Sequence, residues 1–180
     1  MASRIKKTVF SFLLLLCCIH VSFSQQNVIH NKINTDIYNT FSKAYQTLDY
    51  ALFASIHSKK MIRIAGDGGT IKNATEYLKG YEKRWSDPKR TPASIDFRLF
   101  ERIVSDSLVS DRGIYKVSYK DSLQNVRHSY GQFHVLLRLI NKSWKITIDY
   151  DSNEKNTVNE KSYLNAFALS EHTKYSKTKH

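Results

Sequence analysis

The sequence predicts a single α+β domain in which a curved antiparallel sheet packs on three N-terminal helices. Apolar residues recur at helical spacing in the first half of the chain, and the period changes to two from Ser94 onward. Residues 131–151 contain two alternating runs joined by Asn141-Lys142-Ser143. Such runs around a short polar turn are typical of an antiparallel hairpin. We therefore expect the helices first and the sheet after them.

The first 24 residues have the layout of a secretory signal peptide. A basic start is followed by an apolar run from Phe10 to Ile19 and by small residues at Ser22 and Ser24. We expect cleavage after Ser24 and a mature protein that is periplasmic or secreted. The apolar run is well short of the roughly 20 residues that cross a bilayer, so we expect no membrane span in the mature protein.

Both cysteines, Cys17 and Cys18, lie inside this predicted signal. Lipid modification of one of them is an alternative, but each follows a bulky residue where a small one is wanted. With cleavage after Ser24, the mature chain would have no cysteine, and therefore no disulfide, no thiolate metal site and no cysteine nucleophile.

The chain carries a formal net charge of +12, which is compatible with nucleic acid, acidic lipid or acidic glycan as a partner. The basic residues are scattered in short pairs such as Lys59-Lys60 and Lys83-Arg84. No basic helical stripe and no aromatic RNA-binding motif accompanies them. We interpret the charge as solvated surface and expect no nucleic-acid partner.

The segment before the sheet begins with polar residues 25–33, which we expect to be loose. Apolar residues at helical spacing predict an amphipathic helix opened near Asn34 or Thr35 and running to Leu48. Asp49 is a residue type preferred at the N-cap, so we expect a second, short helix to begin after it.

A brief strand from Met61 to Ile64 and a tight turn at Gly66–Gly69 follow these helices. Asn73 and Glu76 have the spacing of a capping box for the third helix, which Asp87-Pro88 ends.

Period-two runs after this point predict an antiparallel meander. Its four strands cover residues 95–104, 107–120, 127–140 and 143–150. The domain would thus span residues 34–151. We expect the polar extension 152–180 to be partly helical, around residues 163–169, or disordered.

This order of elements resembles the nuclear-transport-factor-2-like superfamily, a cone-shaped, cystatin-like fold shared with ketosteroid isomerases, SnoaL-type polyketide cyclases and scytalone dehydratase. The resemblance covers residues 34–151 and rests on the Leu48-Asp49 helix break, the approach Gly68–Asn73 to the third helix, and the hairpin Gly131–Tyr150. It is nearest to the exported SnoaL-like domains named domain of unknown function 4440, which end in a strand Trp-x-Ile-x-x-Asp. Here these residues are Trp144, Ile146 and Asp149.

The resemblance does not extend to isomerase activity. Ketosteroid isomerases place an oxyanion-donating tyrosine on the first helix, and the matching position here is Phe41. They place a general-base carboxylate after the first strand, near Ala65 here, and Asp67 follows it in a glycine-rich turn. A carboxylate on a wet loop is not poised for carbon-acid chemistry.

Strand register gives a different candidate catalytic residue. Alternation along residues 97–103 places Glu101 on the same face as Phe97 and Leu99, the face that would line the cone. A desolvated carboxylate there would have a raised pKa and could act as a general base. The alternative is a bulge near Phe100 that turns Glu101 to solvent.

Aromatic side chains with polar tips predict the lining of the cavity, although aromatic stripes also form ordinary core. Arg63 could be the cation of the cavity or could face solvent. The predicted pocket residues are Tyr45, Arg63, Tyr81, Trp85, Phe97, Tyr115, Tyr119, Phe133 and Trp144.

The outer face of the long hairpin mixes polar and apolar residues, which favours a homodimer interface. The resemblance implies the same arrangement, because members of the superfamily commonly pair through this face. The predicted interface residues are Tyr130, Gln132, His134, Leu136 and Arg138.

Residues 149–160 place oxygen ligands at several positions of a calcium loop. Glu154 stands where such a loop needs glycine, and a strand precedes it where a helix is usual. We interpret the segment as an acidic loop and expect neither a metal nor a cofactor.

Three functions remain open from the sequence. The first is a non-catalytic module whose hydrophobic cavity binds a small hydrophobic or amphipathic molecule. The second is a lyase or isomerase in which Glu101 is the general base and Tyr115 or Tyr45 orients the substrate. The third is an interaction subunit whose cavity is filled.

Overall fold

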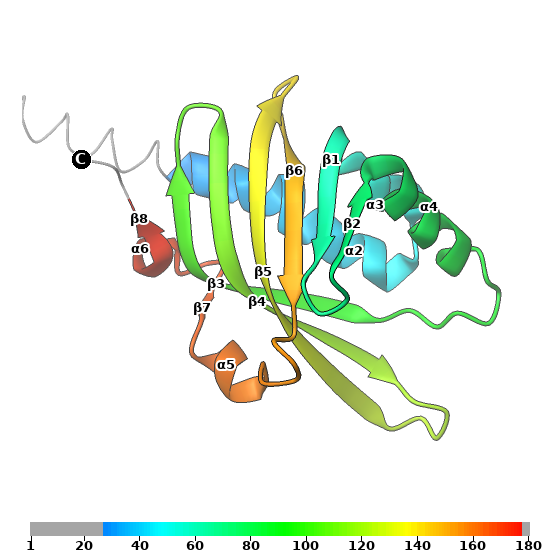
Figure 1. Ribbon diagram of the computed structural model, residues 1–180. Coiled ribbons are helices and arrows are strands. Elements are labelled where there is room, and N and C mark those ends of the chain that lie inside the picture. The colour runs from blue at the N-terminus through cyan, green and yellow to red at the C-terminus, as the bar shows by residue number, and fades with distance from the viewer. Residues whose placement is uncertain (1–26, 178–180) are drawn as a thin grey trace, which may run out of the picture. The chain divides into compact units, whose positions relative to one another are not determined.

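The computed structural model describes residues 27–177 (Figure 1). The predicted signal peptide and its cleavage site after Ser24 lie outside the described residues. The chain divides into two compact units at Ile33. Residues 27–33 were expected to be loose but are helical, and Ile29 and Ile33 have the four-residue spacing of one helical face. The second unit begins at Asn34 and contains the sheet.

The second unit contains the helices that the sequence predicted, although helical backbone already begins at residue 27 and not near Asn34 or Thr35. These are the π-helix η1 (Asn34–Asn39), α2 (Thr40–Thr47), α3 (Tyr50–Ser55) and α4 (Ala74–Trp85). Leu48 adopts a left-handed backbone (φ 52°) that ends α2, and Asp49 accepts the backbone N–H of Leu52 as the N-cap of α3. Asn73 and Glu76 form both hydrogen bonds of the predicted capping box. The helix break and both caps are confirmed.

One sheet contains all the strands of the described residues. They are β1 (His57–Ala65), β2 (Thr70–Asn73), β3 (Ser94–Val104), β4 (Leu108–Lys120), β5 (Val126–Ile140), β6 (Ser143–Ser152), β7 (Phe167–Ala168) and β8 (Ser176–Lys177). The order is β2-β1-β6-β5-β4-β3-β7, with β8 also on β3. Strands β3 to β6 form the predicted antiparallel meander.

The sheet as a whole is mixed, whereas the sequence predicted an antiparallel one. Strand β1 pairs in parallel with β6, and β8 pairs in parallel with β3. An alternating pattern identifies a strand and its buried face but does not identify its partner. For that reason these two parallel pairs could not be predicted from the sequence pattern.

Two bulges in the sheet change which side chains face the helices. The pairing of β3 with β4 skips Phe100, and the pairing of β6 with β5 skips Thr147. Because successive side chains alternate between faces, one extra residue moves every later side chain to the opposite face.

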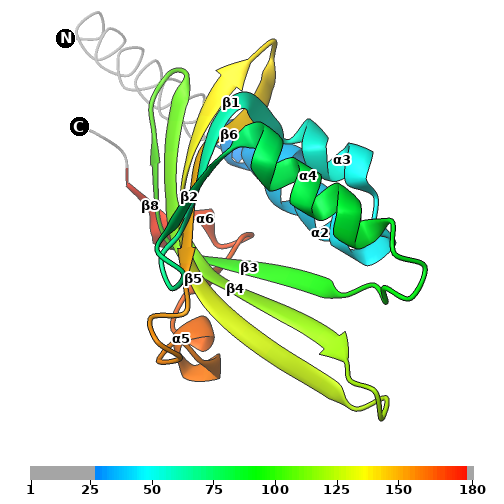
Figure 2. The same cartoon turned by 45° about the vertical axis from the view of Figure 1, so that its right-hand side comes forward.

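The helices α2, α3 and α4 lie on one side of the curved sheet (Figure 2). On that side Phe133 of β5 packs against Tyr38 of η1, with ring centres 6.1 Å apart. Trp144 of β6 is buried, and its backbone N–H donates to Asp36. The main hydrophobic layer thus forms between the helices and the inner face of the sheet, as the predicted cone requires.

The C-terminal segment is part of the same compact unit and not a separate extension. It contains α5 (Glu160–Leu164) and α6 (His172–Tyr175) besides β7 and β8. Tyr163 of α5 is buried over Arg98 and Lys116, which stand on the outer face of β3 and β4. Strands β7 and β8 pair with β3 and so protect part of an edge that would otherwise be open. The helix predicted around residues 163–169 lies earlier, at Glu160–Leu164, and Phe167–Ala168 form the strand β7 instead.

Candidate functional site

A cavity of about 200 Å³ lies between the helices and the inner face of the sheet. Elements η1, α2 and α4 form one wall, and β1 with β3 to β6 forms the other. Aromatic residues form nearly half of its lining, and charged side chains gather in one place. The aromatic residues are Tyr38, Phe41, Tyr45, Tyr77, Tyr81, Phe97, Tyr115 and Phe133, and the charged residues are Arg63, Asp149 and Asp151.

An arginine between two aspartates forms the polar end of the cavity. Arg63 of β1 donates to Asp149 Oδ1 at 2.9 Å and to Asp151 Oδ1. The parallel pairing of β1 with β6 sets Arg63 directly beside Asp149. Asp151 follows two residues later and therefore points to the same face. One guanidinium bridges both carboxylates.

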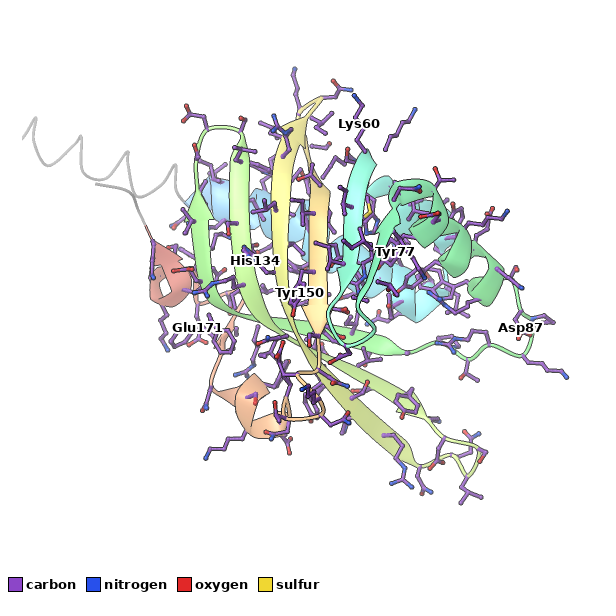
Figure 3. All side chains as sticks on the ribbon, in the orientation of Figure 1. Lys60, Tyr77, Asp87, His134, Tyr150 and Glu171 are labelled. Carbon is purple, nitrogen blue, oxygen red and sulfur yellow. The ribbon has the colours of Figure 1, made fainter. Side chains whose placement is uncertain are left out.

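Two tyrosines complete this polar end. Tyr77 of α4 (Figure 3) donates to Asp149 Oδ2 at 3.4 Å, and Tyr115 of β4 donates to Asp151 Oδ2 at 3.1 Å. The guanidinium carbon of Arg63 lies 5.4 Å from the centre of the Tyr77 ring, within the range of a cation–π contact. Every oxygen of the two carboxylates thus accepts a hydrogen bond from a protein donor.

Burial is the largest influence on the pKa values of the charged groups at the polar end. It raises the pKa of Asp149 and of Asp151, while Arg63 acts in the opposite direction. Burial lowers the pKa of Arg63, but Asp149, Tyr77 and Asp151 together raise it by more. Arg63 therefore stays charged, and the two aspartates take up protons at a higher pH than exposed carboxyl groups do. Burial and Asp151 raise the pKa of Tyr115, so its hydroxyl remains a donor.

Aromatic rings form much of the remaining walls, together with aliphatic side chains such as Val117 and Ile146. Tyr45 of α2 and Tyr81 of α4 meet through their hydroxyl groups at 2.5 Å. Trp85 packs edge-on against Tyr45 with ring centres 5.3 Å apart, behind the lining of the cavity. The faces of these rings carry partial negative charge, so the walls are apolar but attract a cation.

Comparison with solved structures identifies the architecture. An NTF-2 like protein of unknown function from Shewanella oneidensis matches with a TM-score of 0.53 at 21% identity, over 66% of this chain and 98% of that chain. The association domain of CaMKII from C. elegans matches with a TM-score of 0.56 at 10% identity, over 73% and 96%. A ketosteroid isomerase-like protein from Erwinia carotovora atroseptica matches with a TM-score of 0.52 at 13% identity, over 68% and 93%. The chain has the nuclear-transport-factor-2-like fold.

The nuclear-transport-factor-2-like fold is what these proteins share at such low identities, and fold alone carries no activity. No protein-family model matches the sequence, and a search of curated proteins gives no match. The narrower assignment to domain of unknown function 4440 therefore stays a prediction.

Most of the predicted pocket residues stand at the cavity of this nuclear-transport-factor-2-like fold, and their contact with a ligand stays a prediction. Those at the cavity are Tyr45, Arg63, Tyr81, Phe97, Tyr115 and Phe133. Trp85 lies behind Tyr45, and Trp144 is buried near η1. Tyr119 is 43% exposed because it stands on the part of the β4–β5 hairpin that extends beyond the helices (Figure 2). These three residues do not line the cavity.

The sequence did not predict either carboxylate of the cavity: Asp149 was expected at the end of the last strand and Asp151 in an acidic loop after it. Strand β6 runs to Ser152 and contains both of them. Simple alternation from Ile146 would turn them outward, and the bulge at Thr147 turns them inward. Tyr77 could have been found, because it precedes Tyr81 by four residues and so shares its helical face.

Glu101 does not face the cavity, and of the two alternatives that the sequence left open the structure has the bulge at Phe100. The bulge at Phe100 turns its carboxylate to the opposite face, where it accepts Arg112 Nε at 3.0 Å and pairs with Lys177. Lys177 and Arg112 lower the pKa of Glu101, which is the reverse of the expected shift. The hypothesis of Glu101 as a general base thus loses its geometric basis.

The same bulge moves Arg102 into the interior. Its guanidinium donates to both carboxylate oxygens of Asp111, each at 2.8 Å, and both side chains are fully buried. Tyr38 donates to the same carboxylate at 2.6 Å. This buried pair of Arg102 and Asp111 lies on the inner face of the sheet, where the sequence analysis expected Glu101.

The predicted interface residues stand on β5. His134, near the middle of the sheet (Figure 3), shares a hydrogen bond with Ser110 at 2.9 Å, and Gln132 donates to Glu154 at 2.6 Å. The homodimer itself stays a prediction. The full set on β5 is Tyr130, Gln132, His134, Leu136 and Arg138.

The acidic loop after β6 is closed by protein groups. Asp67 accepts the backbone N–H of Asn153 at 2.6 Å and the hydroxyl of Ser152 at 3.1 Å. Within residues 27–177, no group of three or more His, Cys, Asp or Glu side chains could hold a metal ion. In the same part of the chain, no helix is long and apolar enough to cross a bilayer.

Proposed function

We propose that this chain is an exported small-molecule-binding protein whose cavity takes a single-ring ligand with a polar group. The cavity carries the proposal, because aromatic walls converge on one cluster of polar groups at Arg63, Asp149 and Asp151. Apolar pockets with a few convergent polar groups are the usual form of ligand sites. Export rests on the signal-peptide pattern of residues 1–24.

The size of the cavity limits the ligand. Its volume of about 200 Å³ is below the roughly 300–1,000 Å³ of sites for drug-sized molecules. An apolar cavity of about 150 Å³ takes benzene. A ligand with one ring and a short polar substituent fits this range. The open space also argues against an interaction subunit with a filled interior.

A variant that fills the cavity tests the proposal. Val117 lines the cavity, so Val117→Phe should block it and weaken binding of single-ring compounds at least tenfold. Val126→Phe is the matched control, because Val126 lies on the same hairpin and is 59% exposed. Ligand-induced thermal stabilisation measures the effect, since a ligand at about 100 times its Kd adds roughly 2.7 kcal/mol.

Two results would overturn the proposal. One is equal ligand stabilisation of the Val117→Phe variant and the wild type. The other is a wild type that gains no stability from any single-ring compound and shows no retained small molecule in native mass spectrometry after purification from its source.

We also propose a homodimer through the outer face of β5 and β6. The mixed face with Leu136 and His134 supports it, and so does the structural likeness to a CaMKII association domain. Self-complementary pairing of one face about a two-fold axis is the commonest form of assembly.

A further inference from the structure

We propose that the ligand of the cavity is an organic cation, a protonated amine attached to a single ring. The inference rests on the proposed function and names the class of ligand that the same cavity takes. The charge balance, the hydrogen-bonding groups and the walls each support it.

The charge balance of the cavity lining is negative. Asp149 and Asp151 face one cation, Arg63, and no other Lys, Arg or His lines the cavity among the described residues. Arg84 lies 4.3 Å from the ring centre of Tyr81 but is not part of the lining. A ligand with one positive charge would neutralise the polar end, and an anion would add a second excess charge in a poorly hydrated place.

The hydrogen-bonding groups of the polar end are mainly acceptors. Tyr77 and Tyr115 use their O–H groups on the two carboxylates, so their oxygens can only accept from a ligand. Each carboxylate oxygen accepts one protein bond and keeps a further lone pair. An ammonium group is a donor without acceptor capacity. It therefore complements this end, where the donors left for a carboxylate ligand are chiefly the remaining N–H groups of Arg63.

The walls next to the polar end favour a cation as well. The contact between Arg63 and Tyr77 already places a cation near a ring face. Tyr45, Tyr81 and Tyr115 line the same cavity, and cages of such rings are a known way to bind ammonium groups. The uncharged ring of the ligand would pack on Phe41 and the other apolar residues of the lining.

Three compounds of nearly equal size and different charge test the proposal on the full-length protein. Benzylamine is the cation, benzyl alcohol the neutral analogue and benzoate the anion, and calorimetry gives their Kd values at neutral pH. We expect benzylamine to bind at least roughly tenfold more tightly than benzyl alcohol, and benzoate to bind most weakly.

A matched pair of variants locates the effect. Asp151→Asn keeps the shape of the side chain and balances the charge of Arg63, so the preference for benzylamine over benzyl alcohol should disappear. Glu101→Gln removes a carboxylate on the opposite face of the sheet and should leave the preference unchanged.

The order of the three Kd values on the wild type tests the cation proposal even if the Asp151→Asn variant does not fold. Equal binding of benzylamine and benzyl alcohol, or tighter binding of benzoate, would overturn the cation and leave a binding cavity. Equal loss of the preference in Asp151→Asn and Glu101→Gln would also overturn it. Failure of all three compounds to bind would overturn the amine as the ligand class, and the proposed function falls with it only if native mass spectrometry also finds no retained small molecule and no other single-ring compound stabilises the protein.

Discussion

His57 is a buried histidine beside the cavity, packed between rings that line it. Its ring centre lies 5.6 Å from that of Tyr77 and 6.3 Å from that of Phe41. Nδ1 shares a hydrogen bond with the carbonyl of Phe53 at 2.8 Å, and Nε2 has no hydrogen bond within the described residues. Burial lowers the pKa of His57 to about 4. The ring is therefore neutral in the folded protein at neutral pH.

This histidine should make stability sensitive to acid. Above its ordinary pKa of 6.5, His57 is neutral in both states and does not affect the pH dependence. Below that value the unfolded chain binds a proton that the folded chain binds only near pH 4, so stability falls as pH falls. The loss reaches about 3 kcal/mol, since one pKa unit is about 1.4 kcal/mol.

Urea unfolding of the wild type and of His57→Asn at about pH 7 and about pH 4 measures this loss. The variant should lose about 3 kcal/mol less than the wild type over that interval. His134→Asn, on the exposed histidine of β5, is the control. An identical acid loss in the wild type and His57→Asn would contradict the assignment.

The alternation of side chains along a strand predicts which face a residue occupies only as far as the next bulge. Tyr115 could be placed at the cavity because no bulge interrupts the part of β4 that predicts it, whereas for Arg63 the sequence left both the cavity and solvent open. Glu101 was misplaced and Asp151 was missed because Phe100 and Thr147 each add one residue to a strand. Composition does not mark a bulge, so the sequence could offer the bulge at Phe100 only as an alternative and gave no indication of the bulge at Thr147.

At the scale of elements, the C-terminal segment stabilises the sheet from its outer face. Tyr163 and Leu164 are neighbours in α5, and their exposed fractions are 9% and 58%. We expect Tyr163→Ala to lower the free energy of unfolding by about 3 kcal/mol, as for other buried aromatic side chains. Leu164→Ala should change it by less than about 0.5 kcal/mol. Chemical unfolding of both variants checks the contrast, and equal effects would show that α5 does not dock.

Sequence patterns predicted an element well where the interactions that stabilise it are made between residues close together in the chain. The caps at Asp49 and Asn73 are local hydrogen bonds, and both were predicted from spacing. The pairing of β1 with β6 joins distant parts of the chain and left no local pattern. The segment after Ser152 looked like a tail because its polar composition hides a few buried anchors such as Tyr163 and Tyr175.

At the scale of the whole molecule, the proposed homodimer predicts the mass in solution. Analytical ultracentrifugation should give about twice the monomer mass for the wild type. Leu136→Asp, on the outer face of β5, should give a monomer because it buries a charge in the interface. Leu123→Asp is the control, at a position 78% exposed on the tip of the hairpin. A monomeric wild type, or a dimer in the Leu136→Asp variant, would contradict the arrangement.

The polar end of the cavity joins early and late parts of the chain, since Arg63 and Asp151 are 88 positions apart. The site cannot form during synthesis until β6 has emerged from the ribosome, even if the N-terminal helices have already folded. Closing so long a loop is also an intrinsically slow step of folding. A chain exported before it folds, as the signal-peptide pattern predicts, would complete this site only after translocation and would first meet the proposed ligand outside the cytoplasm.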